Sequence, residues 1–280
     1  MIDLHTHSVA SDGTEPPERV VELAAEAGCS AVALTDHDTL AGLAAAGRRA
    51  AELGVDLVPG CEVSCAFRGG SAHVLVYFVG DGDGPFQAEL ARLRGDRVAR
   101  NRRLAARLAD LGLDVSYDEA VAEAASEESL GRPHFAALLV RKGAAASLPD
   151  AFDRWLGEGR PAYVPKERVT PEVVATLARA SGGVAVLAHP LSLGLGAGDL
   201  EAAVGELAQA GLAGIEAYYG DYAPEDRQGL ARLAASHGLV ATGGSDHHGE
   251  VKPDLAVGTG RGDLAVPDRV LADLSARRPG

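Results

Sequence analysis

Residues 17–39, PERVVELAAEAGCSAVALTDHDT, contain one complete helix and strand. Apolar residues recur at helical spacing over residues 17–27, and Gly28 follows, as is usual just past a helix end. The next run, AVALT at residues 31–35, is short and apolar, which predicts a buried strand. An Asp-His-Asp tripeptide at residues 36–38 follows it directly. The stretch therefore predicts a strand whose carboxyl end carries metal-capable side chains.

The same alternation of strand and helix continues along much of the chain. Repeated strand-then-helix units predict a parallel sheet. This many units in one domain favour a closed barrel, with an open, doubly wound sheet as the alternative. The predicted strands are residues 1–4, 31–35, 55–58, 73–79, 184–188, 214–218 and 239–242, and the predicted helices are residues 17–27, 40–53, 171–180, 199–210 and 224–237.

The alternation stops between about residues 80 and 166. A turn-rich run, GDGDGP at residues 80–85, precedes a long Arg-rich helical pattern and three shorter helical patterns with no strand between them. We expect an inserted helical subdomain at residues 81–165, within a barrel domain made of residues 1–80 and 166–280. Seven arginines are spread around the long helix and interleaved with acidic residues, which favours a solvated helix over a track for an RNA backbone.

Composition excludes several classes of protein. The chain has 280 residues, 46% of them hydrophobic, so it can bury a full core. A net charge of −14 argues against a binder of long nucleic acids, which needs a basic face. The sequence has neither an apolar run of about 18 residues nor a signal-peptide pattern, so we expect no membrane anchor and a cytoplasmic location. Cys29, Cys61 and Cys65 lack zinc-site spacing and are expected to be reduced thiols, a metal role for the last two being the alternative.

Metal-capable side chains recur at the ends of the predicted strands. His5 and His7 lie one residue apart and share one face of the first strand, because alternate strand residues point the same way. Parallel barrels assemble their sites at the carboxyl ends of their strands, so we expect these side chains to converge. Imidazole and carboxylate suit Zn, Mn or Fe, and a carboxylate can bridge two ions about 3.5–4 Å apart. The set is His5, His7, Asp12, residues 36–38, Glu62 after the third strand, His73 at the start of the fourth, His189 and residues 246–248.

Six motifs resemble, in order, those of the PHP (polymerase and histidinol phosphatase) family: DLHTHSVASDGT, ALTDHDT, GCEVS, HVLVYF, VLAHP and GSDHHG. Members of that family are metal-dependent phosphoesterases on a distorted seven-stranded barrel. The chain resembles most closely the subgroup with an inserted helical subdomain, which includes nucleoside 3′,5′-bisphosphate phosphatases and 5′-to-3′ oligoribonucleases. The resemblance therefore implies an α/β fold, a distorted (β/α)7 TIM-like barrel with a small helical insertion.

The resemblance also implies two to three divalent ions, Mn, Zn or Fe, and their ligands. One ion would be held by His5, His7, Glu62 and Asp246, and Glu62 would bridge to a second ion on His73 and His189. A third ion would be held by Asp12, His37 and His248, with Asp12 standing where some members have His. His247 replaces the aromatic residue common between the last two ligands, and His237, late in a helix, is interpreted as a surface residue.

The insertion offers a candidate phosphate-binding group. Arg132 and His134 lie in GRPHFA and Lys166 in YVPK. A guanidinium binds phosphate oxygens through two donors and an ammonium acts as a point charge, so both suit a phosphate beside the metals. His134 is assigned to substrate, with metal binding as its alternative. Either His134 or a metal-bound water would protonate the leaving oxygen. For Arg132 the alternative is an ordinary residue at a helix start.

These residues predict a phosphoesterase acting on a small phosphorylated substrate. We expect a nucleoside 3′,5′-bisphosphate that loses its 3′-phosphate, because Arg132 and Lys166 would grip one phosphate while the metals attack the other. Short RNA and histidinol phosphate are the alternative substrates. A binuclear amidohydrolase lacks a set equivalent to Asp12, His37 and His248, and a binding domain with a dead site would be expected to have lost ligands.

Overall fold

The structure is a computed structural model that describes residues 1–124, 127, 130–165 and 167–279. The chain forms two compact units, one of Met1–Glu89 with Arg168–Gly280 and the other of Leu90–Glu167. We call them the barrel unit and the helical unit. The domain limits expected at residues 80/81 and 165/166 stay a prediction.

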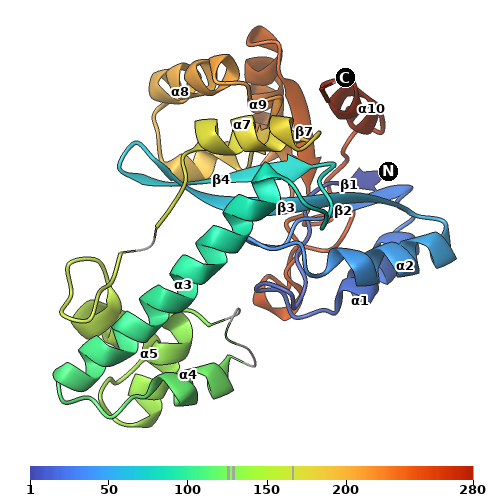
Figure 1. Cartoon of the computed structure of the whole chain (residues 1–280). Helices are drawn as coiled ribbons and strands as arrows, with labels where there is room; N and C mark the ends of the chain where they lie inside the picture. Colours follow the sequence, from blue (N-terminus) through green and yellow to red (C-terminus); the bar gives the residue numbers. More distant parts are fainter. Residues whose placement is uncertain (125–126, 128–129, 166, 280) are drawn as a thin grey trace. The chain divides into compact units, whose positions relative to one another are not determined.

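The barrel unit contains one seven-stranded sheet in which the strand order follows the chain order. Its first and last strands also approach each other, since Leu4 N donates to Gly243 O at 3.2 Å. The sheet is therefore nearly closed, and the expected distorted seven-stranded barrel is confirmed (Figure 1). The strands are β1 Ile2–Asp3, β2 Ala31–Leu34, β3 Asp56–Phe67, β4 Gly70–Tyr77, β5 Val184–Leu187, β6 Gly214–Tyr219 and β7 Val240–Gly244.

The expectation of a wholly parallel sheet is wrong at β4. This strand runs antiparallel to both β3 and β5, whereas the other neighbours are parallel. The reason is a hairpin in which Phe67 pairs with Gly70 around a two-residue turn. Arg68 and Gly69 form that turn with φ of 46° and 81°, the left-handed backbone that tight hairpin turns require. The hairpin also carries β3 well past its expected end at residue 58.

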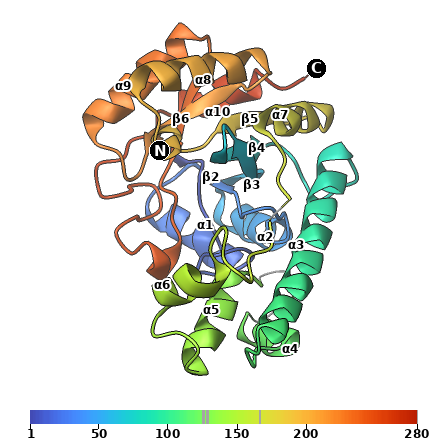
Figure 2. The ribbon, with the colours of Figure 1, turned by 90° about the vertical axis from the view of Figure 1, so that its left-hand side faces the viewer.

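Helices cover the outside of the sheet, and Figures 1 and 2 show α1 and α2 packed side by side. Among the described α-helices of this unit, α1, α7 and α9 have a proline in the first turn, where a missing N–H costs no hydrogen bond. Gly54 ends α2 in the left-handed conformation, with φ of 70°. The helices of this unit that the structure describes are α1 Pro17–Glu26, α2 Leu43–Leu53, α7 Pro171–Ala180, α8 Ala197–Gln209, α9 Pro224–Ser236 and α10 Arg269–Ser275; α3 Pro85–Asp110 begins in it and continues into the helical unit.

The barrel core is built from strand residues two apart in sequence. Ala31 and Ala33 of β2 and Val184 and Val186 of β5 belong to one buried cluster, because residues two apart on a strand share a face. Tyr77 is also fully buried there, and its hydroxyl donates to Leu4 O at 2.8 Å. The interior of the barrel is thus apolar at this cluster, and the polar side chains described below lie beyond this core.

The helical unit has its own apolar core. It contains most of α3, then α4 Tyr117–Glu123, α5 Arg132–Arg141, α6 Leu148–Ala151 and a π-helical turn, Phe152–Leu156. Leu104, Leu108, Phe135 and Leu138 pack together in this core, each with no exposed surface. A capping box starts α4: Ser116 Oγ accepts from Glu119 N at 3.2 Å while Ser116 N donates to Glu119 Oε2 at 3.0 Å.

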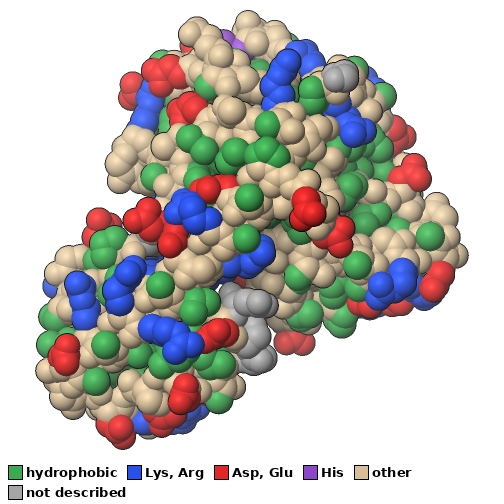
Figure 3. Space-filling view, viewed as in Figure 1, with side chains coloured by type: hydrophobic (Ala, Val, Ile, Leu, Met, Phe, Trp, Pro, Cys, Tyr) green, Lys and Arg blue, Asp and Glu red, His purple; other side chains and the backbone are tan. Residues whose placement is uncertain are grey.

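Arginines of α3 are engaged within the helical unit. Arg92 pairs with Asp96 at 2.5 Å, Arg102 pairs with Glu127, and the largely buried Arg100 donates to Asn101 Oδ1. Acidic and basic side chains are interleaved on the face of this unit that Figure 3 shows. The exposed pairs of Arg92 and Arg102 agree with the solvated helix favoured by the sequence, whereas Arg100 is buried. In the part of the chain that the structure describes, no helix is long and apolar enough to cross a membrane.

Candidate metal centre

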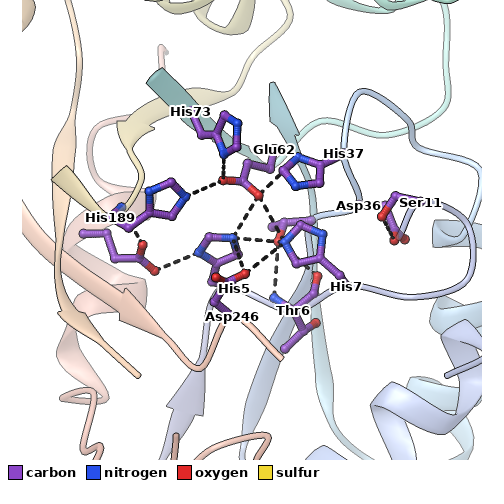
Figure 4. Close-up of polar contacts among 12 residues, drawn as sticks. His5, Thr6, His7, Ser11, Asp36, His37, Glu62, His73, His189 and Asp246 are labelled. Carbon is purple, nitrogen blue, oxygen red and sulfur yellow. Dashed lines mark hydrogen bonds and ion pairs between the residues drawn. The ribbon is translucent and has the colours of Figure 1, made fainter. Parts of the chain in front are cut away.

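The metal-capable side chains of the barrel unit gather at one end of the barrel. His5 and His7 follow β1, His37 follows β2, His189 follows β5, and Asp246 and His248 follow β7. Figure 4 shows the imidazoles of His5, His7, His37, His73 and His189 turned toward Glu62. The structure thus brings together residues far apart in the sequence.

Glu62 and His73 reach this place differently from what the sequence predicts. Glu62 lies in the middle of β3 and His73 in the middle of β4, where it pairs with Ser64 across the hairpin. The expectation that Glu62 follows the third strand is therefore wrong, and so is the expectation that His73 starts the fourth. The antiparallel hairpin explains the difference, because it continues both strands past the rim on which the other residues lie.

The first group surrounds one oxygen of Glu62. Glu62 Oε2 lies 3.1 Å from Nε2 of both His5 and His7, and these two nitrogens are 3.1 Å apart. Asp246 Oδ1 lies 3.4 Å from each of the same nitrogens. All four side chains are at most 3% exposed. Two nitrogens and two oxygens thus face a single point.

The second group lies at the other oxygen of Glu62. Glu62 Oε1 is 2.9 Å from His73 Nδ1 and 3.0 Å from His189 Nε2. His37 Nδ1 is 3.3 Å from Oε2, so His37 also borders this carboxylate. Because its two oxygens face different imidazoles, Glu62 stands where a carboxylate that bridges two ions would stand.

The third group is centred on Asp12, whose side chain is about half exposed. Its oxygens lie 3.4 Å from His248 Nε2, 3.6 Å from His7 Nδ1 and 3.7 Å from His37 Nε2. His37 therefore lies between Glu62 and Asp12, with Nδ1 toward the first and Nε2 toward the second.

The electrostatics of the first group suit a cation. Burial disfavours a charged His7, but Asp246 and Glu62 outweigh it and raise the pKa of His7 to about 9. Burial likewise opposes charge on Glu62, yet His37 and His5 hold its pKa well below the ordinary value. Anions and imidazoles at such short distances stabilise one another only through shared protons or a bound cation.

Some ring nitrogens of these histidines have no hydrogen-bond partner, and this bears on whether the residues could bind a metal. Nδ1 of His7, His37 and His73 is buried and has no hydrogen-bond partner, although each faces a carboxylate. A buried ring nitrogen without a partner is unfavourable, and at His73, whose Nδ1 lies 2.9 Å from Glu62 Oε1, a metal could bind the lone pair. Mixed imidazole and carboxylate donors are the set that Zn, Mn and Fe accept. The residues fit divalent metal ions.

Glu216 is a supporting residue that the sequence analysis missed. It is fully buried in β6, where Oε1 lies 2.9 Å from His5 Nδ1 and Oε2 accepts from His189 N at 2.8 Å. By accepting from Nδ1–H, Glu216 leaves the lone pair of His5 on Nε2, toward the first group. The signal was present in GIEAY, because an acid within an apolar strand needs a buried partner.

Other loops are fixed by buried acids. Asp36 accepts from Ser8 N, Ser8 Oγ and Ser11 Oγ, each at 2.7 Å, and thereby holds the loop that carries Asp12. Figure 4 shows Asp36 and Ser11 paired away from the imidazoles. His189 and Asp246 have positive φ of 25° and 56°, and such strained backbone concentrates at functional sites.

A cavity of about 450 Å³ opens onto these groups. His37, Glu62, His73, His189, Asp246 and His248 line one part of it. Its remaining lining residues are Leu191, Ser192, Tyr219, Asp221, Tyr222 and Lys252. A second cavity, of about 430 Å³, lies among β7, α9 and α10 and has no histidine among its lining residues, so the chemistry belongs to the first.

The candidates in the insertion have local roles in the helical unit. Arg132 Nη1 donates to Leu156 O at 3.3 Å, and its guanidinium lies 5.7 Å from the ring centres of Phe152 and Tyr163. His134 Nδ1 accepts from Gly131 N at 3.1 Å, which closes the first turn of α5. Lys166 lies outside the described residues.

The side chains of the two histidines without an assigned function belong to none of the three groups. His247 Nδ1 donates to Leu255 O at 2.7 Å, while its buried Nε2 has no hydrogen-bond partner. His237 follows the last residue of α9, and its ring lies against Gly205.

Fold and site together define a metal-dependent hydrolase on a seven-stranded barrel. Residues 3–128 match the PHP domain family. Over 247 residues the chain is 34% identical to a 3′,5′-nucleoside bisphosphate phosphatase of Chromobacterium violaceum, covering 88% of this chain and 87% of the relative. It is 35% identical to the 5′-3′ exoribonuclease Rnm of Salmonella typhimurium, over 88% of this chain and 84% of the relative.

A solved structure agrees with these similarities. A crystal structure from Bifidobacterium adolescentis, described as that of a metal-dependent phosphoesterase, superposes with a TM-score of 0.79 at 31% identity. The match covers 100% of this chain and 96% of the other. The chain belongs to the PHP family and is a metal-dependent phosphoesterase.

Proposed function

We propose that the chain removes the 3′-phosphate from nucleoside 3′,5′-bisphosphates with two or three bound ions of Mn, Zn or Fe. The observation that carries this proposal is the arrangement at Glu62, whose two oxygens face separate groups of imidazoles beside a cavity of about 450 Å³. A cavity of this volume suits a small nucleotide. The bisphosphate phosphatase relative supports the same substrate class.

The proposed ligands follow the three groups. His5, His7, Glu62 and Asp246 would hold one ion, Glu62 with His73 and His189 a second, and Asp12, His37 and His248 a third. Divalent ions supply a water nucleophile at neutral pH and neutralise charge on the phosphoryl group.

The supporting hydrogen bonds orient these imidazoles. His5 Nδ1 donates to Glu216 and His248 Nδ1 donates to Asp246 O at 2.9 Å. In both rings the lone pair is thereby left on Nε2, which faces its group. These hydrogen bonds thus orient both rings with Nε2 toward the proposed ligand groups.

We further propose that residues from the insertion bind the substrate. Arg132 and Lys166 would hold the phosphate that is not cleaved, and His134 would donate a proton to the leaving oxygen. Their support is chemical: guanidinium and ammonium groups bind phosphate oxygens, and imidazole transfers protons near neutral pH.

The test compares kcat/KM for adenosine 3′,5′-bisphosphate, adenosine 5′-monophosphate, histidinol phosphate and a short 5′-phosphorylated RNA, each with Mn, Zn or Fe. We expect the bisphosphate to be the best substrate. Arg132→Ala should narrow its advantage over the monophosphate while leaving the metal content unchanged. Protein carrying Glu62→Ala, purified identically, controls for contaminating phosphatases. Faster cleavage of RNA or histidinol phosphate would contradict the substrate but not the phosphoesterase class.

Metal analysis of two further variants tests which of His134 and His189 is a metal ligand. His189→Ala should lower the metal content, since Nε2 lies 3.0 Å from Glu62, whereas His134→Ala should leave it unchanged. The reverse pattern would exchange their roles.

A further inference from the structure

Lys252 stands at the cavity beside the candidate metal ligands. It follows a short 3-10 turn, Gly249–Val251, and its side chain is 36% exposed. Its ammonium contacts Asp246 Oδ2.

Asp246 divides its two oxygens between different partners. Oδ1 faces the Nε2 atoms of His5 and His7 at 3.4 Å. Oδ2 instead accepts from Tyr219 Oη at 2.6 Å and from the Lys252 ammonium. Lys252 is therefore held at the edge of the first group by an oxygen that the group does not use.

The charges around the cavity single out Lys252. Among the described residues that line it, Lys252 is the only lysine or arginine, and Glu62, Asp221 and Asp246 are acidic. Asp221 already pairs with Arg261, whose side chain lies outside this lining. A phosphate entering the cavity thus meets one amino-acid cation besides the imidazoles.

The geometry of an ammonium leaves capacity for that phosphate. A lysine has three N–H donors, and the contact with Asp246 uses one. The 36% exposure of the side chain keeps the others accessible from the cavity. A compact, hydrated charge on a flexible stem can turn toward a phosphoryl oxygen without leaving Asp246.

We propose that Lys252 binds a phosphoryl oxygen of the substrate and of the product phosphate, and so acts as a catalytic residue in the barrel unit itself. The inference rests on the phosphoesterase activity of the family, and does not depend on the nucleotide proposed above. The competing role is purely structural: Lys252 would only balance the charge of Asp246.

The chain provides a matched control, because it has three lysines, Lys142, Lys166 and Lys252. Lys142 lies in the helical unit and pairs with Glu119 at 2.6 Å. Lys252→Met and Lys142→Met each remove one ammonium and keep most of the aliphatic stem. Metal content by elemental analysis and the dissociation constant of inorganic phosphate by calorimetry are measured on Mn-loaded protein.

Lys252→Met should weaken phosphate binding about ten- to hundredfold, the size of one charge-assisted hydrogen bond. Metal content should stay at the wild-type level, Lys252→Arg should restore part of the affinity, and Lys142→Met should change neither quantity. Unchanged phosphate affinity in Lys252→Met would overturn the proposal. So would a loss of affinity that only follows a loss of metal.

A labelling experiment on the Mn-loaded wild-type protein gives a readout independent of any variant. An amine-reactive reagent is applied with and without inorganic phosphate, and each lysine is followed by peptide mass spectrometry. Phosphate should slow the labelling of Lys252 and leave that of Lys142 unchanged. Equal labelling of Lys252 in both conditions would overturn the proposal. If phosphate slows the labelling of Lys252 but the nucleoside bisphosphate is not cleaved, only the proposed substrate is rejected.

Discussion

Carboxylates in the two units meet cations of different kinds. In the helical unit, Glu123 accepts from Arg141 at 2.6 Å, and both side chains are substantially exposed. In the barrel unit, Glu62 is 1% exposed and faces four imidazoles of His5, His7, His73 and His189 within 3.1 Å. An exposed pair loses little hydration and contributes about 0–1 kcal/mol. A buried carboxylate requires partners, and an imidazole partner that gives up its proton can then offer its lone pair to a metal.

The difference teaches which charged clusters carry function. The sequence shows both regions as rich in ionisable residues. Among the residues that the structure describes, several buried groups converge on one point with ring nitrogens lacking a hydrogen bond only in the barrel unit. Burial and convergence, rather than the number of charges, therefore separate a metal centre from a solvated helix.

The largest effect should come from Glu62→Ala. Removing the bridging carboxylate should lower kcat/KM by more than the about 10–100-fold typical for loss of a supporting partner, and should release at least one equivalent of metal. Elemental analysis and a phosphatase assay give the two values. Cys61→Ala, a buried neighbour on the same strand but on its other face, should retain its metal. Equal losses in both variants would mean that the centre is misplaced.

Glu216→Gln should have the next largest effect. The amide keeps the shape of the side chain but removes the charge that orients His5, so metal affinity should fall about 10–100-fold. Competition with a chelator measures that affinity. Glu206→Gln is the control, because Glu206 is exposed and pairs with Arg68 at the surface. Wild-type affinity in Glu216→Gln would show that this carboxylate has no part in metal binding.

A smaller effect is expected from pH. In metal-free protein the pKa of His7 is raised from 6.5 to about 9: burial opposes this shift, but Asp246 and Glu62 outweigh it. The stability from protonated His7 is therefore full below about pH 6.5 and is lost as pH rises through about 9. The Tm of metal-free protein should fall between pH 7 and 9.

Metal affinity should change in the opposite direction, since a ligand imidazole must lose its proton. It should rise over the same pH range, with proton release detected by calorimetry in buffers of different ionisation heat. Metal binding to the His7→Gln variant should release fewer protons than metal binding to the wild type. Metal binding at pH 7.5 without any proton release would contradict the raised pKa.

The smallest effect belongs to the helical unit. Arg141→Ala should change the free energy of unfolding by only about 0–1 kcal/mol, because its partner Glu123 is reached across solvent-exposed surface. Denaturant titration measures the change, and metal content should be unaltered. A loss of metal in the Arg141→Ala variant would contradict the view that charged pairs of the helical unit play no part in the metal centre.

The sequence alone determined the alternation of strands and helices, and with it a barrel and a helical insertion. Local periodicity and the residues at helix ends encode these elements, as in residues 17–39. It also placed His5, His37, His189 and Asp246 after strands, where parallel topology would bring them together.

Tertiary structure alone decided the direction of β4, the position of Glu62 within β3, and the contacts of Glu216 and Lys252. The period of a strand is the same whichever way the strand runs, so a hairpin and a parallel crossover look alike in the apolar pattern. Contacts such as that of Glu216 with His5 join residues 211 apart in the chain. They exist only because the sheet closes, and no local pattern records that closure.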